Sequence, residues 1–243
     1  KYCKHTAMPG LIETINLDWR DDKQNLTVAM VQSKLPSNSD FEQHGIMLDD
    51  VGFKARHRLH VADVAALVCK HIDAQRTDDS ERKERGKQID LIVWPELSVS
   101  HDDLDILITL SRKTHSIIYA GLGFIKQDNV EGPNNCAVWI VPPKANSEQK
   151  ELIRLQGKHN MMAEEVGKIE PWRPYQLMLE LKHPKFPSKP GFVITGSICY
   201  DATDISLSAD LKDKTNAYAV CALNKDVNTF DTMIDALHYH MFQ

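Results

Sequence analysis

The strongest strand signal in the chain is Ile89-Asp90-Leu91-Ile92-Val93-Trp94-Pro95-Glu96, an apolar run that ends at a proline and a glutamate. Apolar runs of this length with branched side chains are typical of buried strands. A helix is expected next, because Ser100 or Asp102 can cap it and apolar side chains then recur at helical spacing from Leu104. A buried strand followed by an amphipathic helix is the repeating unit of α/β proteins, so this stretch indicates the fold class.

Strands and helical segments alternate along the rest of the chain. Short apolar runs predict further strands at 26–31, 117–124, 136–141, 151–155, 192–198 and 217–223. An amphipathic helix is predicted from 59 to 72, whereas 33–50 has the composition of a surface loop and 171–190 is proline-rich and without a clear pattern. This order predicts a layered α/β domain over 25–243, preceded by a polar leader or linker at 1–24.

Composition excludes several classes of protein. The chain has 243 residues, of which 42% are hydrophobic and 26% charged, and its net charge of -5 gives no bulk attraction for nucleic acid. No apolar run approaches the ~20 residues of a membrane span, and the first residues contain no apolar signal-peptide region. Five cysteines without a CxxC spacing favour free thiols in a reducing compartment, so we expect a cytoplasmic protein.

Three residues whose side chains could take part in catalysis each follow a predicted strand: Glu96, Lys158 and Cys199. In α/β folds, sites assemble at strand ends and in the loops after them. A carboxylate partly withdrawn from water suits a general base, and a lysine can donate hydrogen bonds to a developing oxyanion. A thiol after a strand, with Gly196 allowing close backbone approach, fits a nucleophile on a strand-to-helix turn, with the backbone N–H of Tyr200 directed at the reacting carbonyl.

Each of these residues also has an ordinary interpretation. A strand-end glutamate or a lysine is commonly only solvated, and a free cysteine often packs in the core. Their order, each after its own strand, makes the functional interpretation stronger. Glu164 and Glu165 follow Lys158 closely enough for either to anchor its ammonium group.

At these residues the chain resembles the nitrilase, or carbon–nitrogen hydrolase, superfamily. The matching segments are 28–32, 90–97, 157–160 and 196–201, within a resemblance that extends over 25–243. The resemblance implies an αββα sandwich, a homodimer or higher oligomer, and a Glu96–Lys158–Cys199 triad that works without a cofactor. It implies hydrolysis of a non-peptide carbon–nitrogen bond, in a small amide or nitrile, through a thioester on the cysteine.

The resemblance also suggests supporting residues. A second glutamate usually follows the lysine, and Glu165 is the nearest match, with Glu164 the next. Substrate-pocket groups often follow the last strand, which makes Asn224 a candidate, while the Tyr200 N–H would be the second oxyanion donor. We expect Lys158→Ala to be nearly silent in the fold and severe in turnover.

The chain departs from the superfamily pattern in two places. Ala202-Thr203-Asp204-Ile205 stands where many amidases carry an Arg-Phe-Pro-Glu-like run, and the superfamily normally continues beyond Gln243 into another strand. The first residue is Lys1 and not a methionine, so we expect a piece of a longer polypeptide whose C-terminal sheet element is missing here. Two other functions therefore stay open: a nitrilase-like regulatory or binding module of a fused protein, such as a reverse transcriptase of a bacterial antiphage system, and acyl transfer from the thioester to an amine or thiol.

Metal binding is not expected. The pairs His57-x-x-His60 and His238-x-His240 have spacings found in metal sites, but neither has a carboxylate or thiolate at ligand spacing. The mixed-charge run from 76 to 87 is expected to be a solvated helix end or loop.

Overall fold

The computed structural model describes residues 2–17, 19, 23–78, 89–144, 148–223 and 227–241. They form two compact units, each assembled from segments that are distant in the sequence. Unit 1 comprises Lys1–Lys23, Lys126–Ala137 and Leu155–Gln243, and unit 2 comprises Gln24–Ile125 and Val138–Arg154. Each unit combines a five-stranded sheet with helices, which confirms the mixed α/β class predicted from the sequence.

The sheet of unit 2 has the strand order β3-β4-β5-β8-β9. Its strands are β3 (Val28–Met30), β4 (Leu91–Val99), β5 (Ile117–Leu122), β8 (Cys136–Val141) and β9 (Leu152–Gly157). β8 begins and β9 ends within segments of unit 1. β3, β4 and β5 are parallel, and every residue of β5 and β8 is buried, so the core of this unit lies along the middle of its sheet.

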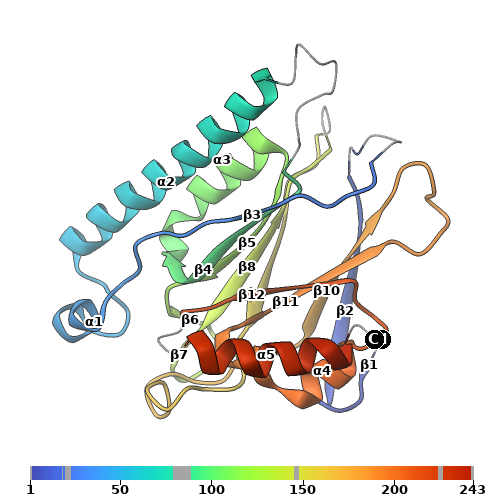
Figure 1. Ribbon diagram of the computed structural model, residues 1–243. Helices are drawn as coiled ribbons and strands as arrows, with labels where there is room; N and C mark the ends of the chain where they lie inside the picture. Colours follow the sequence, from blue (N-terminus) through green and yellow to red (C-terminus); the bar gives the residue numbers. More distant parts are fainter. Residues whose placement is uncertain are drawn as a thin grey trace. The chain divides into compact units, whose positions relative to one another are not determined.

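Two long helices of unit 2 lie side by side, as Figure 1 shows for α2 (Val51–Asp78) and α3 (Leu104–Thr114). Arg58 of α2 links them, because its guanidinium lies 2.7 Å from Asp103 and from Asp105. The short 3₁₀ helix η1 (His101–Asp103) precedes α3, with Ser100 as its N-cap. No helix in the described part of the chain combines the length and the apolar character that a bilayer span requires.

Two local predictions in unit 2 are wrong. The segment 33–50 is not only loop, since it contains α1 (Asn38–His44), which begins with a capping box between Ser37 and Asp40. Ser, Asn and Asp favour both loops and helix N-termini, so composition alone does not separate the two. β3 is also not a buried strand: it is at the edge of the sheet, and Met30 is 88% exposed.

The sheet of unit 1 has the strand order β1-β2-β10-β11-β12. Its strands are β1 (Tyr2–Cys3), β2 (Met8–Asn16), β10 (Gln176–Lys182), β11 (Phe192–Ile198) and β12 (Ala217–Cys221). β10 is parallel to β2 and antiparallel to β11, which is parallel to β12. A separate pair joins β6 (Ile125–Lys126) to β7 (Pro133–Asn134).

Helices cover part of this second sheet. The 3₁₀ helix η2 (Cys199–Thr203) continues directly into α4 (Ile205–Leu211), and α5 (Val227–Met241) follows β12. Met178 of β10 packs with Leu207 and Leu211 of α4 in a buried cluster. The turn that follows β11 is therefore anchored on one side by the sheet and on the other by α4.

The prediction of a polar leader or linker at 1–24 is wrong for β2. Within β2 (Met8–Asn16), residues 10–16 pair with β10 and residues 8 and 9 pair with β1, so the N-terminal segment is part of the sheet. The segment 171–190 likewise contains β10 and is not patternless. Polar residues such as Glu13 and Thr14 hide the alternation in β2, and its parallel partner lies far along the chain, where sequence pattern gives no sign of the pairing.

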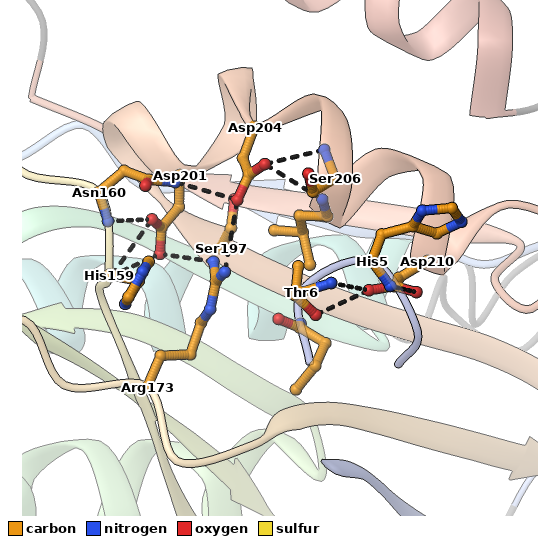
Figure 2. A network of polar contacts seen from close by, with 12 residues as sticks. His5, Thr6, His159, Asn160, Arg173, Ser197, Asp201, Asp204, Ser206 and Asp210 are labelled. Carbon is orange, nitrogen blue, oxygen red and sulfur yellow. Dashed lines mark hydrogen bonds and ion pairs between the residues drawn. The ribbon is translucent and has the colours of Figure 1, made fainter. Parts of the chain in front are cut away.

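A buried aspartate of α4 attaches the N-terminal segment. Asp210 is 1% exposed. Its carboxylate accepts hydrogen bonds from the backbone N–H groups of His5 at 3.0 Å and Thr6 at 2.8 Å, and from the Thr6 hydroxyl at 2.7 Å (Figure 2). Burial acts to raise the pKa of Asp210, but these hydrogen bonds outweigh it and the pKa lies below the ordinary value of 3.8.

We expect Asp210→Asn to lower the free energy of unfolding by about 1–3 kcal/mol at neutral pH, because one acceptor and the charge are lost at a buried site. A carboxyl whose pKa is lower in the folded than in the unfolded chain stabilises fully above the unfolded pKa, near ~3.9, and this contribution disappears as the pH falls through the folded pKa. Urea denaturation of the wild type and the variant should therefore show a difference that shrinks below pH ~4. A difference that is the same at all pH values would contradict this assignment.

Candidate functional site

Lys158 directly follows β9 and is 1% exposed, which is rare for a lysine unless it is paired. Its Nζ lies 2.8 and 2.7 Å from the two carboxylate oxygens of Glu165. The backbone is fixed as well: the Lys158 N–H donates to the Asn135 carbonyl, and the Lys158 carbonyl accepts from the Trp172 N–H, both at 2.9 Å. The ammonium group is thus held at a defined position and shielded from bulk solvent.

Glu165 is itself held by three donors. Besides Lys158, the Asn135 amide donates to one carboxylate oxygen at 3.1 Å, and the backbone N–H of Met162 donates to the other at 2.8 Å. Glu164, the other glutamate that the sequence leaves open, is exposed to solvent. Glu165 is therefore the glutamate that orients Lys158.

Cys199 lies where β11 ends and η2 begins. Its φ of 45° is in the left-handed region, which non-glycine residues seldom adopt. The residue is 3% exposed, and its Sγ is 4.0 Å from the Leu223 carbonyl oxygen. Such strained strand-to-helix turns are common at functional sites, where they present one side chain in a fixed direction.

A carboxylate connects the Cys199 turn to the Lys158 loop. Asp201, two residues after the cysteine and completely buried, accepts hydrogen bonds from the backbone N–H of His159 at 3.0 Å and of Asn160 at 2.6 Å. The Asn160 side-chain amide also donates to Asp204 at 3.1 Å (Figure 2). The segment that carries the lysine and the turn that carries the thiol are thus fastened together within unit 1.

The network also contains a cation that was not predicted from the sequence. The Arg173 side chain is 1% exposed, and its guanidinium lies 3.1 Å from Asp201 and 3.5 Å from Asp204 (Figure 2). Burial raises the pKa of Asp201, while the Arg173 charge and the hydrogen bonds from Asn160 and His159 act in the opposite direction. Arg173 stands in the proline-rich segment before β10, where no local pattern marks it as special.

Glu96 belongs to unit 2, whereas Lys158, Glu165 and Cys199 all belong to unit 1. It is 3% exposed and lies within β4, which continues through Pro95 and does not stop there as predicted. The pairing of β4 with β5 is irregular next to Glu96, Leu97 has a φ of 57°, and a Cβ added to Gly121 would collide with the Glu96 backbone. Glu96 thus occupies a buried irregularity of its strand, a kind of backbone that is frequent at active sites.

Comparison with solved structures shows which fold this is. A CN-hydrolase superfamily protein from Xanthomonas campestris, described with an arsenic adduct in its active site, matches 76% of this chain and 65% of its own length at 13% identity and a TM-score of 0.50. A mutant of the amidase from Nesterenkonia sp. AN1 matches over 89% of this chain and 75% of its own length, at 14% identity and a TM-score of 0.55. Saccharomyces cerevisiae Nit3, a member of branch 10 of the nitrilase superfamily, matches over 92% and 71%, at 15% identity and a TM-score of 0.53. This chain has the nitrilase-superfamily fold.

The likeness is one of structure. No protein-family sequence model and no curated protein sequence matches the chain. The chain spans about two thirds to three quarters of the length of these solved structures, from 65% to 75%. The nitrilase-type fold was the expectation from the sequence segments around Glu96, Lys158 and Cys199, and the structural neighbours confirm it.

The structure describes only some of the other residues that the sequence singles out. Tyr200 is the second residue of η2, and it is 40% exposed. Asn224 lies outside the described residues, as do most of the charged run and the side chains of His238 and His240. His57 stacks on the Phe53 ring at 5.7 Å, and no group of three or more potential metal ligands occurs in the part of the chain that the structure describes.

Proposed function

We propose that this protein hydrolyses the carbon–nitrogen bond of a small amide or nitrile, with Cys199 as nucleophile and Lys158 as an oxyanion donor. The observation that carries the proposal is the Asp201 carboxylate, which fastens the turn of Cys199 to the backbone directly after Lys158. A buried, oriented ammonium group and a thiol on a strained turn therefore belong to one assembly within unit 1. In a mutant of the Nesterenkonia amidase, which shares the fold, acrylamide adds to the active-site cysteine, and this supports a nucleophilic role for the cysteine here.

The proposed reaction of an amide has two stages. Glu96, the base predicted from the sequence, accepts the Cys199 thiol proton as the sulfur attacks the carbonyl carbon. Lys158 and the Tyr200 N–H stabilise the negative charge that develops on the carbonyl oxygen. The carbon–nitrogen bond breaks as Glu96 returns the proton to the nitrogen, which leaves as ammonia or an amine. Water that gives a proton to Glu96 then hydrolyses the thioester, releasing a carboxylic acid and the free thiol.

We expect acrylamide to label Cys199 far faster than Cys3 and Cys136 at pH 7.5. Burial raises the pKa of Cys136 to about 12 and also raises the pKa of Cys3, with the Asp210 charge adding to the shift. The thiolate is the reactive form, so Cys136 has roughly 10³-fold less of it than an ordinary thiol with a pKa of ~8.5. Peptide mass mapping of the folded protein across a range of pH measures all the sites at once, with Cys136 as the internal reference.

Ammonia-release and labelling assays on the wild type and on site variants distinguish the proposal from its alternatives. Ammonia release from a panel of short aliphatic amides and nitriles should depend on Cys199 and disappear in Cys199→Ala. Glu96→Gln should change the pH dependence of Cys199 labelling if Glu96 is the base. The proposal is overturned if Cys199 reacts no faster than Cys136. An acyl-enzyme that only an added amine can discharge would replace hydrolysis by acyl transfer.

A further inference from the structure

The Arg173 guanidinium is the buried positive charge of the network that joins the Cys199 turn to the Lys158 loop. Of its two carboxylate partners, Asp201 lies within the 3₁₀ helix that starts at Cys199, and Asp204 directly follows that helix. The same Asp204 caps α4 through the N–H groups of Ser206 and Leu207 (Figure 2). One cation from the segment before β10 therefore contacts the middle and the C-terminal end of the turn that carries the thiol.

Stability alone does not account for this ion pair. A buried pair loses much of its Coulomb gain to desolvation, and apolar replacements are often as stable. Within the described residues neither Nε nor Nη1 of Arg173 makes a hydrogen bond, so the guanidinium is not fully satisfied and its 3.1 Å contact with Asp201 is an ion pair. What the pair does fix is geometry, because the Asp201 carboxylate binds Arg173 with one oxygen and at the same time accepts the two backbone N–H groups after Lys158.

We propose that Arg173 is a positioning residue. It holds Cys199 at a fixed position relative to Lys158, because it fixes the Asp201 carboxylate that links the two segments. The inference rests on the proposed function, since it needs Cys199 to be the nucleophile. Arg173 contacts neither reacting group and acts through Asp201. When Arg173 is removed, the position of the Cys199 thiol relative to the Lys158 ammonium group should change, while the surrounding fold persists.

Variants of both partners separate positioning from a direct charge effect. Arg173→Met should slow acrylamide labelling of Cys199 and move the pH midpoint of labelling upward, because a thiolate loses the benefit of a well-placed cation. Asp201→Asn is the decisive variant: removing a nearby negative charge would by itself move the midpoint downward, whereas loss of positioning moves it upward. We expect an upward shift in both variants. Arg173→Lys, which keeps the charge, should recover part of the rate.

On an amide that the wild type hydrolyses, kcat should fall about 10²-fold in Arg173→Met with little change in KM, the size of effect produced by a misplacement of ~1 Å. Asp210→Asn is the matched control, since it weakens another buried carboxylate network of unit 1 that involves neither Cys199 nor Lys158. It should lower the Tm and leave the pH profile of Cys199 unchanged.

Three results would overturn the inference, and they are distinguishable. If wild-type Cys199 labels no faster than Cys136, the proposed function fails and the inference fails with it. If wild-type Cys199 is reactive, and the Arg173 and Asp201 variants lower only the Tm and keep the pH profile of Cys199 labelling, then Arg173 only stabilises the fold. The proposed function stands in that case. A downward shift in Asp201→Asn would likewise exclude positioning, and it can be measured even if Arg173→Met does not fold.

Discussion

Replacing Lys158 by methionine should lower turnover about 10²–10³-fold, the usual cost of removing one oxyanion donor. The fold should also suffer, by about 3–5 kcal/mol in the free energy of unfolding, because the partly buried carboxylate of Glu165 loses its charged partner. The sequence alone predicts a nearly silent effect of this position on the fold, and the 1% exposure of the Lys158 side chain is the reason to revise that prediction. Urea denaturation and ammonia release on the same preparations measure the two losses separately.

A double variant distinguishes catalysis from stability. Lys158→Met combined with Glu165→Gln removes both charges, and the glutamine oxygen can still accept a hydrogen bond from Asn135 or Met162. Stability should return to within about 1–2 kcal/mol of the wild type, since no unpaired charge stays buried. Turnover should remain as low as in the single variant. Recovery of turnover together with stability would mean that Lys158 supports the fold and is not an oxyanion donor.

Gly157→Ala should cause the largest structural loss of any glycine substitution next to the site. A Cβ at residue 157 would overlap the Trp172 carbonyl oxygen and lie 2.6 Å from its carbonyl carbon, both backbone atoms that cannot rotate away. The hydrogen bond between the Trp172 N–H and the Lys158 carbonyl would have to break. We expect the free energy of unfolding to fall by more than about 3 kcal/mol, which corresponds to a Tm lower by at least ~6 °C.

Gly123→Ala is the matched control for this prediction. The nearest atom to a Cβ at that position is the Val99 carbonyl oxygen at 3.8 Å, an ordinary contact. Its Tm should stay close to that of the wild type. A Cβ at residue 157 would press on Trp172, which is hydrogen-bonded to Lys158 and is followed in the chain by Arg173. Any Gly157→Ala protein that folds should therefore also label slowly at Cys199. Equal Tm values for the two variants would show that the chain can relax around residue 157.

The sequence determined those parts of the fold whose stability is local. The strands β8 and β11 have the predicted bounds 136–141 and 192–198: β8 is a continuous apolar run that is entirely buried, and β11 combines branched apolar residues with small ones and is buried from Ile194 to Ile198. The helix after Ser100 was also readable from its cap and apolar spacing. β2 and β10 were not, because mixed polar and apolar strands are stabilised by a partner on a distant segment, and the pairing leaves little local signal.

The sequence by itself also predicted the chemical types at the candidate site. A lysine and a cysteine that directly follow separate strands, and a glutamate near the end of a third strand, are visible without coordinates, since reactive residues near strand ends form a pattern along the chain. Only the tertiary structure decided that Glu165 and not Glu164 orients Lys158, and that Arg173 and Asp201 join the lysine loop to the cysteine turn. The physical reason is that burial and ion pairing depend on which distant segments meet, and the energy of a charged group is set by those neighbours and not by its place in the chain.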